Sequence, residues 1–210
     1  MKIIKKIINR TFIDNINSHL DKISYKDSLC IFRNEDPILY ELVRKNLLSN
    51  IFFKKIIKNN NCYIVFRMIK KNDTKRSLEA HFDNYSKTYF IPLKVPQNLN
   101  RREEINLRGD LYLWENARDM PRSLLFHACT KVIFQNKYVS KLIRYFFQHK
   151  FKRAVMEIGD VLYFNGFTTF HYTSLVSSEH RSLVIHTDMP FDKSRLMKLI
   201  DWYSRYRTRH

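Results

Sequence analysis

Histidine and aspartate recur in this sequence at a spacing that can hold a metal ion. The His-x-Asp pattern occurs at 19–21, 81–83 and 186–188. On an extended strand, residues i and i+2 point to the same face, so an imidazole and a carboxylate can bind one ion together. A chain with 8 histidines produces this pattern easily, so the surrounding sequence has to separate the copies.

Two of the three copies have unfavourable surroundings. A helical pattern surrounds His19, and on a helix residues i and i+2 diverge around the cylinder, which predicts a solvated surface position. His186 ends the last expected strand, with only His210 further along the chain as another imidazole, which predicts a structural role. His81 precedes several expected strands and a further histidine, His171, so the copy at His81 is the candidate metal site.

The order of motifs from His81 onward resembles the Fe(II)- and 2-oxoglutarate-dependent dioxygenases. His81-Phe82-Asp83 is followed by Gly-Asp-Val-Leu-Tyr-Phe at 159–164, then by His171, and ten residues later by Arg181. The resemblance extends over roughly residues 63–187. The spacing from His171 to Arg181 is most similar to the prolyl-hydroxylase and phytanoyl-type branches of that superfamily.

The resemblance implies a metal centre with a chelating co-substrate. Two histidines and one carboxylate on one side of Fe(II) leave open positions for 2-oxoglutarate and O2. Residues His81, Asp83 and His171 match these ligand positions and are the expected catalytic residues. Arg181 matches the basic residue that pairs with the far carboxylate of 2-oxoglutarate, a partner that suits a guanidinium fork.

Further residues are expected near this site. Tyr63, Arg67, Thr88 and Tyr89 lie on expected strands and are candidates for contacting 2-oxoglutarate or substrate. His180 precedes Arg181 and is therefore expected to face away from the pocket. The segment 115–122 is a candidate substrate loop.

The resemblance also implies a reaction. Oxidative decarboxylation of 2-oxoglutarate to succinate and CO2 would be coupled to hydroxylation of a C–H bond in a small molecule, a lipid or glycolipid, or a protein. Nucleic-acid demethylases of the superfamily carry R-x-N-x-T-x-R after the second histidine. The sequence from Arg181 to Thr187 lacks the Asn and the second Arg, so a nucleic-acid substrate is disfavoured.

The elements that must position these residues indicate an α+β fold with one domain. Helices come first, at 1–20 and 37–58, followed by short β-rich runs, a helix at 138–149 and a last helix at 192–206. The expected strands are 62–69, 88–95, 109–114, 131–134, 154–158, 161–164, 168–173 and 181–186. This order predicts a jelly-roll, cupin-like double-stranded β-helix at 62–188, flanked by a helical region at 1–58 and a helix at 190–210.

Composition limits the class of protein. With 44% hydrophobic residues the 210-residue chain is globular, and its formal net charge of +18 favours anionic partners, although a sequence rich in Lys, Ile and Asn also suggests AT-rich coding. Three scattered cysteines form no disulfide framework, and no apolar stretch is long enough to span a bilayer. We expect a cytoplasmic protein with reduced cysteines.

Two alternatives of other classes stay open. The first is a jelly-roll binding module without catalytic activity, which would retain the fold and bind no metal. The second is a basic protein on a membrane or nucleic-acid surface, with amphipathic helices at 1–20 and 192–209 facing anionic lipid. If these terminal helices pack on the core instead, that second alternative fails. The sequence does not set the oligomeric state.

Overall fold

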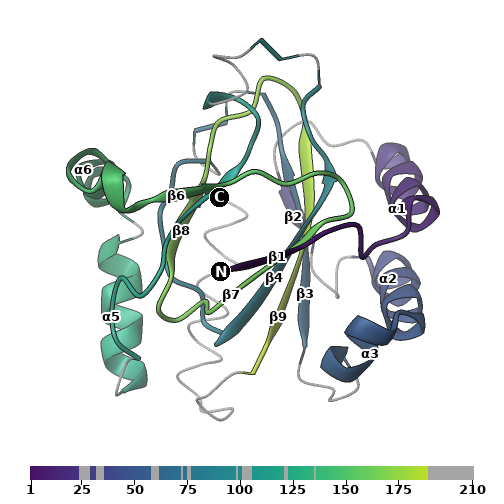
Figure 1. Cartoon of the computed structure of the whole chain (residues 1–210), viewed down its shortest axis with the longest axis horizontal. Helices are drawn as coiled ribbons and strands as arrows, with labels where there is room; N and C mark the ends of the chain where they lie inside the picture. The colour runs from purple at the N-terminus through teal and green to yellow at the C-terminus, as the bar shows by residue number, and fades with distance from the viewer. Residues whose placement is uncertain are drawn as a thin grey trace.

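In the computed structural model, two antiparallel β-sheets face each other between two layers of helices (Figure 1). The structure describes residues 1–23, 29–31, 36–57, 62–71, 73–74, 77–97, 99–100, 106–120, 123–134 and 136–188. The expected helix at 192–206 lies outside these residues.

The larger sheet has six strands in the order β1-β7-β4-β9-β3-β2. Its strands are β1 (Lys2–Ile4), β2 (Leu29–Ile31), β3 (Tyr63–Ile69), β4 (Lys87–Lys94), β7 (Val161–Phe164) and β9 (His180–Thr187). The smaller sheet has the order β6-β5-β8, with β5 (Leu111–Trp114), β6 (Lys152–Ala154) and β8 (Phe170–Thr173). The antiparallel sheets and the mixed α and β content agree with the predicted fold class.

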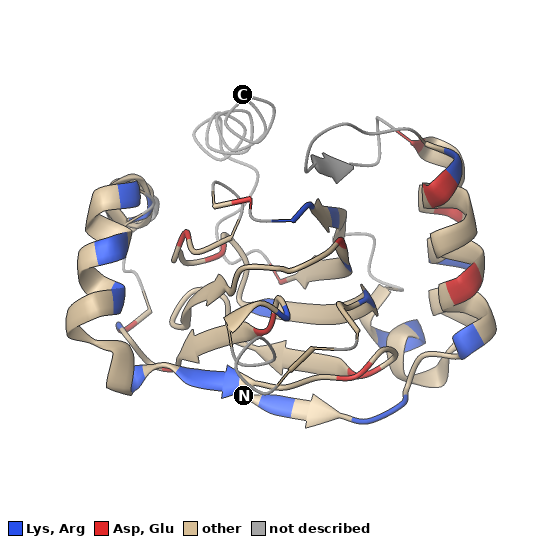
Figure 2. Cartoon of the chain, turned by 90° about the horizontal axis from the view of Figure 1, so that it is seen from above, with Lys and Arg blue, Asp and Glu red and all other residues tan. Residues whose placement is uncertain are grey.

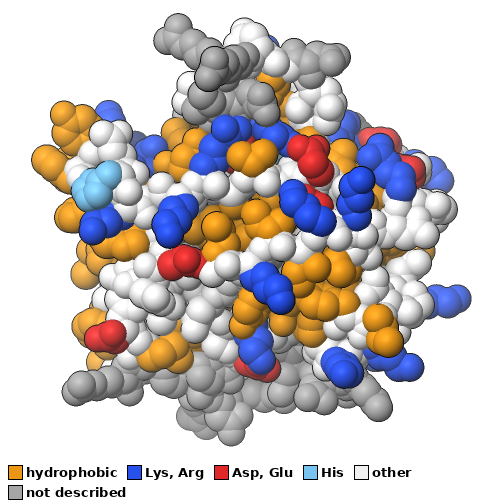
Figure 3. Space-filling view, in the orientation of Figure 1, with side chains coloured by type: hydrophobic (Ala, Val, Ile, Leu, Met, Phe, Trp, Pro, Cys, Tyr) orange, Lys and Arg blue, Asp and Glu red, His pale blue; other side chains and the backbone are white. Residues whose placement is uncertain are grey.

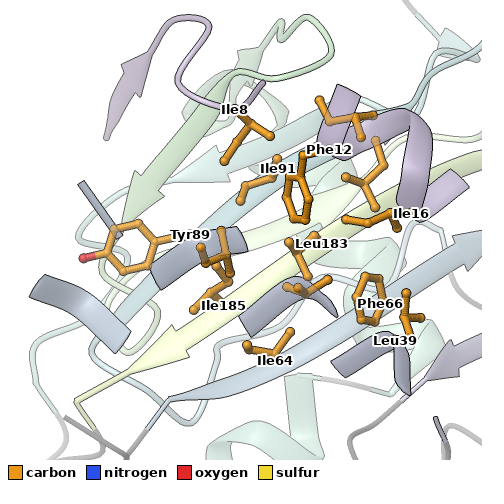
Figure 4. Packing of buried hydrophobic residues seen from close by; sticks show 14 of the residues in the cluster. Ile8, Phe12, Ile16, Leu39, Ile64, Phe66, Tyr89, Ile91, Leu183 and Ile185 are labelled. Atoms are coloured by element: carbon orange, nitrogen blue, oxygen red, sulfur yellow. The ribbon is translucent and has the colours of Figure 1, made fainter. Parts of the chain in front are cut away.

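Helices α1 (Arg10–Lys22), α2 (Pro37–Ser49) and α3 (Ile51–Ile57) cover the outer face of the larger sheet. Their apolar residues pack on alternate residues of β3, β4 and β9, among them Phe66, Ile91 and Leu183 (Figure 4). In α1 the buried side chains are Phe12, Ile13, Ile16 and Leu20. This helical layer therefore follows the usual rule that an amphipathic helix buries its apolar stripe.

The N-terminal segment differs from the prediction of one long helix. Residues 2–4 form β1, which pairs with β7, and the helix begins only at Arg10 after the Asn9 cap. Asp160 holds the intervening turn, because its carboxylate accepts hydrogen bonds from Lys5 Nζ and the backbone N–H of Lys6. Asp160 of the Gly-Asp motif is thereby used to fix this turn.

The helix predicted at 37–58 is divided in two at Asn50. This residue has an extended backbone, its side-chain amide donates to the carbonyl of Ile7, and its side-chain oxygen accepts from the N–H of Phe52. Asn50 thus ends α2 and caps α3. Asn side chains favour such positions because they hydrogen-bond to nearby backbone groups in competition with the helix.

The remaining helices lie against the smaller sheet. They are α5 (Leu124–Phe134), α6 (Lys137–Phe146) and the short 3-10 helix η1 (Gln148–Lys150). Helix α6 matches the prediction at 138–149, whereas α5 contradicts the strand expected at 131–134. An apolar run such as Lys-Val-Ile-Phe cannot be assigned by period alone, and here the helical neighbours decide. None of the described helices is long and apolar enough to cross a membrane.

Candidate metal centre

The three predicted ligands converge between the two sheets. His81 and His171 form an antiparallel bridge through two backbone hydrogen bonds of 2.9 and 3.0 Å, which sets their rings 4.5 Å apart. The backbone N–H of Asp83 donates to the carbonyl of Gly166. A Cβ on Gly166 would lie 2.6 Å from the Cβ of Asp83, so a glycine is required for this close approach.

The ligand atoms of these three residues lie within 4.8 Å of one another. The Nε2 atoms of His81 and His171 are each 3.7 Å from Oδ1 of Asp83. Ligand atoms about 2.1 Å from an octahedral ion stand about 3 Å apart at right angles. Bringing each imidazole nitrogen and Oδ1 of Asp83 onto one ion therefore requires an approach of less than about 1 Å for each of these two pairs.

Both imidazoles are held in the tautomer that a metal ligand requires. Nδ1 of His81 lies 2.9 Å from the carbonyl of Glu79, and Nδ1 of His171 lies 3.2 Å from the carbonyl of Thr169. A carbonyl only accepts, so each Nδ1 carries the proton and each Nε2 keeps a free lone pair. Such contacts orient the ligating histidines of metal sites.

The two carboxylate oxygens of Asp83 also have separate roles. The Thr88 hydroxyl donates to Oδ2 of Asp83 at 2.6 Å, which leaves Oδ1 for an ion. Nδ1 of His186 lies 3.1 Å from the Thr88 oxygen and therefore donates to it. His186, for which the sequence predicts a structural role, is in fact a close neighbour of the site.

Burial sets the protonation of this group. Desolvation lowers the pKa of His81 well below its ordinary value, with a further contribution from His171, and it also lowers the pKa of His171. Desolvation would raise the pKa of Asp83, but His171, His186 and His81 together hold it below its usual range. Neutral imidazoles and an ionised carboxylate are the states that bind a divalent cation.

The site is open on one side. The side chain of His81 is 24% exposed, whereas those of Asp83 and His171 are 10% and 5% exposed. Apolar residues of both sheets, including Phe90, Leu113 and Phe164, fill the interior beside the triad. Solvent or a ligand can therefore reach the triad from the side of His81, where it passes these apolar side chains.

The structure does not bring Arg181 to the triad. Its guanidinium donates to Glu179, to Asp21 of α1 and to the carbonyl of Asn17, all on the side of the larger sheet that faces the helices. It lines a cleft of about 400 Å³ between α1 and β4 there. The prediction that Arg181 faces the metal site is wrong in this geometry, because its neighbour Leu183 on the same face belongs to the helix-side core.

The residues of β9 that do face the interior are the alternate ones. His180, Ser182 and His186 lie on the face opposite Leu183, so the expectation that His180 points away is also wrong. His180 is buried, and desolvation together with Arg67 and Arg108 lowers its pKa to about 3. Among the described residues, Nδ1 of His180, Oγ of Ser182 and Oγ1 of Thr173 are buried without a hydrogen-bond partner.

The other four candidates divide three to one. Tyr63 and Arg67 are on β3 opposite His186 and Ser182, and Thr88 contacts Asp83 directly. The positive charge of Arg67 lowers the pKa of His171, after the larger effect of burial. Tyr89, in contrast, packs in the helix-side core against Phe53 and Tyr163 and does not reach the site.

Sequence reasoning missed a polar network that joins α5 to the triad. Lys131 Nζ and Nε2 of His127 both donate to Oδ1 of Asn84, the residue after Asp83, at 2.9 and 3.0 Å. Arg118 donates to Nδ1 of His127 and lies 3.8 Å over the ring of Phe82. The i,i+4 spacing of His127 and Lys131 was the available signal, hidden by assigning a strand there. Of the predicted substrate loop, Arg118 is thus used structurally, and residues 121–122 lie outside the described part.

Comparison with known proteins gives structural matches alone. No protein-family model matches the chain, and no curated protein matches it in sequence. A prolyl-4-hydroxylase from Pseudomonas putida superposes with a TM-score of 0.52 at 9% identity, covering 90% of this chain and 92% of that one. HygX from Streptomyces hygroscopicus, solved with nickel and 2-oxoglutarate, gives 0.55 at 11% identity over 92% and 84%.

A third match is SnoN, a non-heme α-ketoglutarate-dependent epimerase from nogalamycin biosynthesis, with a TM-score of 0.54 at 10% identity over 88% and 77%. The chain therefore has the fold shared by these three proteins. That agrees with the fold that the motif resemblance implied. At such identities the matches establish the fold alone.

Proposed function

We propose that this protein is an Fe(II)- and 2-oxoglutarate-dependent oxygenase with a double-stranded β-helix core. The observation that carries the proposal is the convergence of two Nε2 lone pairs and one carboxylate oxygen, from His81, His171 and Asp83, with every competing atom already hydrogen-bonded. A nitrogen, nitrogen, oxygen set on one side of an ion is the donor set of non-heme iron oxygenases.

The triad residues would hold Fe(II) through these three atoms. The bound iron would supply activation of O2, coupled to oxidative decarboxylation of 2-oxoglutarate to succinate and CO2. The protein's own contribution is positional. Backbone carbonyls of Glu79 and Thr169 keep the imidazoles oriented, and Thr88 keeps one carboxylate oxygen free.

We assign the anchoring of 2-oxoglutarate to Arg67 in place of Arg181. Arg67 is directly opposite Ser182, on the interior face of the larger sheet, and its charge acts on His171, His180 and His186. A guanidinium suits a terminal carboxylate. The buried Oγ of Ser182 and Oγ1 of Thr173 offer hydroxyl donors to the same anion.

The type of reaction can be proposed more narrowly than the class of substrate. The matched structures include a prolyl hydroxylase and an epimerase, two enzymes named for different reactions. For this chain we propose hydroxylation of a C–H bond in a substrate that enters past His81, the exposed member of the triad. The inactive-module alternative predicts no metal binding, and the complete donor set argues against it.

The test is succinate release from 2-oxoglutarate in air with added Fe(II). The wild-type chain should form succinate, and Asp83→Ala should reduce the rate to that of iron alone, because no carboxylate then binds the ion. Circular dichroism spectra of the two proteins should match. Equal succinate formation by the wild type and Asp83→Ala would overturn the iron assignment.

A matched pair of arginine variants tests the co-substrate assignment. Arg67→Ala should raise the 2-oxoglutarate concentration needed for half-maximal turnover by about tenfold or more, the usual cost of losing a charged hydrogen bond, and Arg67→Lys should restore part of it. Arg181→Ala should leave that concentration unchanged. The opposite ranking would return the anchor to Arg181.

A further inference from the structure

Helix α5 buries polar side chains and exposes most of its large apolar ones, Phe134 excepted. Its buried residues include His127 and Lys131, which reach inward to Asn84. The apolar residues on the other side are between 55% and 64% exposed, namely Leu125, Phe126, Val132 and Ile133. This is the reverse of the arrangement expected for a surface helix of a globular protein.

Helix α6 continues the same surface. The residue it buries is Ser140, whose hydroxyl accepts from the N–H of Ala80 and donates to the carbonyl of Leu78. Its exposed large side chains are Tyr138, Leu142, Tyr145 and Phe146, at 56% to 72% exposure. We call these four residues and the four exposed apolar residues of α5 the α5–α6 face.

The α5–α6 face is at one edge of the molecule. In Figure 1 both helices are at the left, on the far side of the sheets from α1 to α3, and hydrophobic side chains gather along this edge in Figure 3. Exposed apolar side chains gathered into one patch commonly mark binding surfaces.

The charged side chains of α5 and α6 themselves are all positive. The sequence from 120 to 156 contains no Asp or Glu. Lys137 and Lys141 flank the exposed stripe of α6, and Lys150 and Lys152 follow it, all exposed. In Figure 2, α6 at the left carries Lys and Arg and no acidic residue. A partner that is apolar at its centre and negatively charged around it would therefore complement these two helices.

We propose that the α5–α6 face binds the surface of a lipid bilayer that contains anionic head groups. Aliphatic and phenylalanine side chains would enter the acyl boundary, Tyr138 and Tyr145 would lie at the head-group level, and the lysines would contact phosphates. The helices lie on the bilayer and do not cross it. This site differs from the terminal helices predicted from sequence, since α1 buries its apolar stripe in the core.

A second copy of the chain fits this face less well. In a two-fold dimer each patch meets itself, so the lysines of one copy would approach those of the other. Like charges brought together in this way oppose association. An anionic bilayer instead neutralises Lys137, Lys141 and their neighbours while covering the same apolar residues.

The experiment is flotation of the full chain with phosphatidylcholine vesicles, with and without phosphatidylserine. The wild type should float with the phosphatidylserine vesicles and much less with phosphatidylcholine alone, and salt should weaken it. Phe126→Ser with Ile133→Ser should lower the partition coefficient at least about tenfold, from the loss of buried apolar area. Lys137→Glu with Lys141→Glu should lower binding to the vesicles that contain phosphatidylserine and should not lower binding to vesicles of phosphatidylcholine alone.

The matched control is Ile38→Ser with Ile51→Ser. These isoleucines are 74% and 84% exposed on α2 and α3, on the opposite layer, and their loss should leave flotation unchanged. Equal loss in the control would overturn the proposal. Absence of wild-type flotation would do the same, and so would a wild-type dimer that Phe126→Ser with Ile133→Ser converts to a monomer without any vesicle binding.

Discussion

The two helical layers are attached to the sheets in opposite ways. Helices α1 to α3 bury an apolar face that includes Ile16, Leu39 and Phe53, none of them measurably exposed. Helices α5 and α6 are held by polar contacts at His127, Lys131 and Ser140, although ring contacts such as Phe134 with Phe82 add to them. The first layer stabilises the fold by burying apolar surface. The second layer is held by hydrogen bonds to the segment that carries His81 and Asp83.

This difference separates residues that affect the stability of the fold from residues that affect the site. A change in the α1 to α3 layer should act on the free energy of unfolding, whereas a change in the inward contacts of α5 and α6 should act on both unfolding and turnover. Changes on the outward side of α5 and α6 should affect neither.

The largest effect is expected for Phe53→Ala in α3. Phe53 is fully buried and packs edge-on against Phe52 and Tyr89, so its removal leaves a cavity. The free energy of unfolding should fall by about 3–5 kcal/mol in urea titration. A loss below about 1 kcal/mol would show that this layer is loosely packed.

Ser140→Ala should have an intermediate effect on stability and a clear one on activity. It leaves the buried N–H of Ala80 without its acceptor, which costs about 1–3 kcal/mol. Because Ala80 precedes His81, the affinity for Fe(II) should fall as well. Ser49→Ala, which removes an exposed hydroxyl contact on α2, is the control and should change neither quantity; equal effects of both variants would remove the link between α6 and the site.

Acid should destabilise the polar layer. Burial, with Arg118 and Lys131, lowers the pKa of His127 to about 3, so the unfolded chain binds this proton more readily below pH 6.5. Its contribution is fully present above about pH 6.5 and is lost as the pH falls toward 3. The slope of unfolding free energy against pH in this window should decrease by up to one proton in His127→Gln. An unchanged slope would mean that His127 is already charged in the fold.

The smallest effect on stability is expected for Val132→Ser. This side chain is on the exposed side of α5, so the free energy of unfolding should change by no more than about 0.5 kcal/mol. Thermal melting would check this. A loss above about 1 kcal/mol would show that the α5–α6 face is covered within the protein itself.

The sequence was a good guide to the strands around the site and a poor one to which side chain faces it. The strand at 161–164 matches β7 residue for residue, and the strands with Arg67 and His171 lie close to their expected bounds. Clear β-branched and aromatic runs with polar borders explain this success. The three proposed ligands, His81, Asp83 and His171, could be singled out because they occur in a recognisable order along the chain.

The orientation of Arg181 could not be obtained in the same way. A spacing of ten residues from His171 identifies the strand, but a shift of one residue moves every side chain to the other face. Only the pairing of Ser182 with Arg67 and of Leu183 with Phe66 fixes that register. Similarly, β1 and α5 depend on tertiary partners, Asp160 and Asn84, that no local pattern shows.

An anaerobic crystal structure with Mn(II) in place of Fe(II), and with 2-oxoglutarate, would test the central proposal most directly. We expect the ion within about 2.3 Å of Nε2 of His81, Nε2 of His171 and Oδ1 of Asp83. The far carboxylate of 2-oxoglutarate should then pair with Arg67. An ion bound elsewhere, or a triad without metal at saturating Mn(II), would contradict the assignment of this chain as a 2-oxoglutarate-dependent oxygenase.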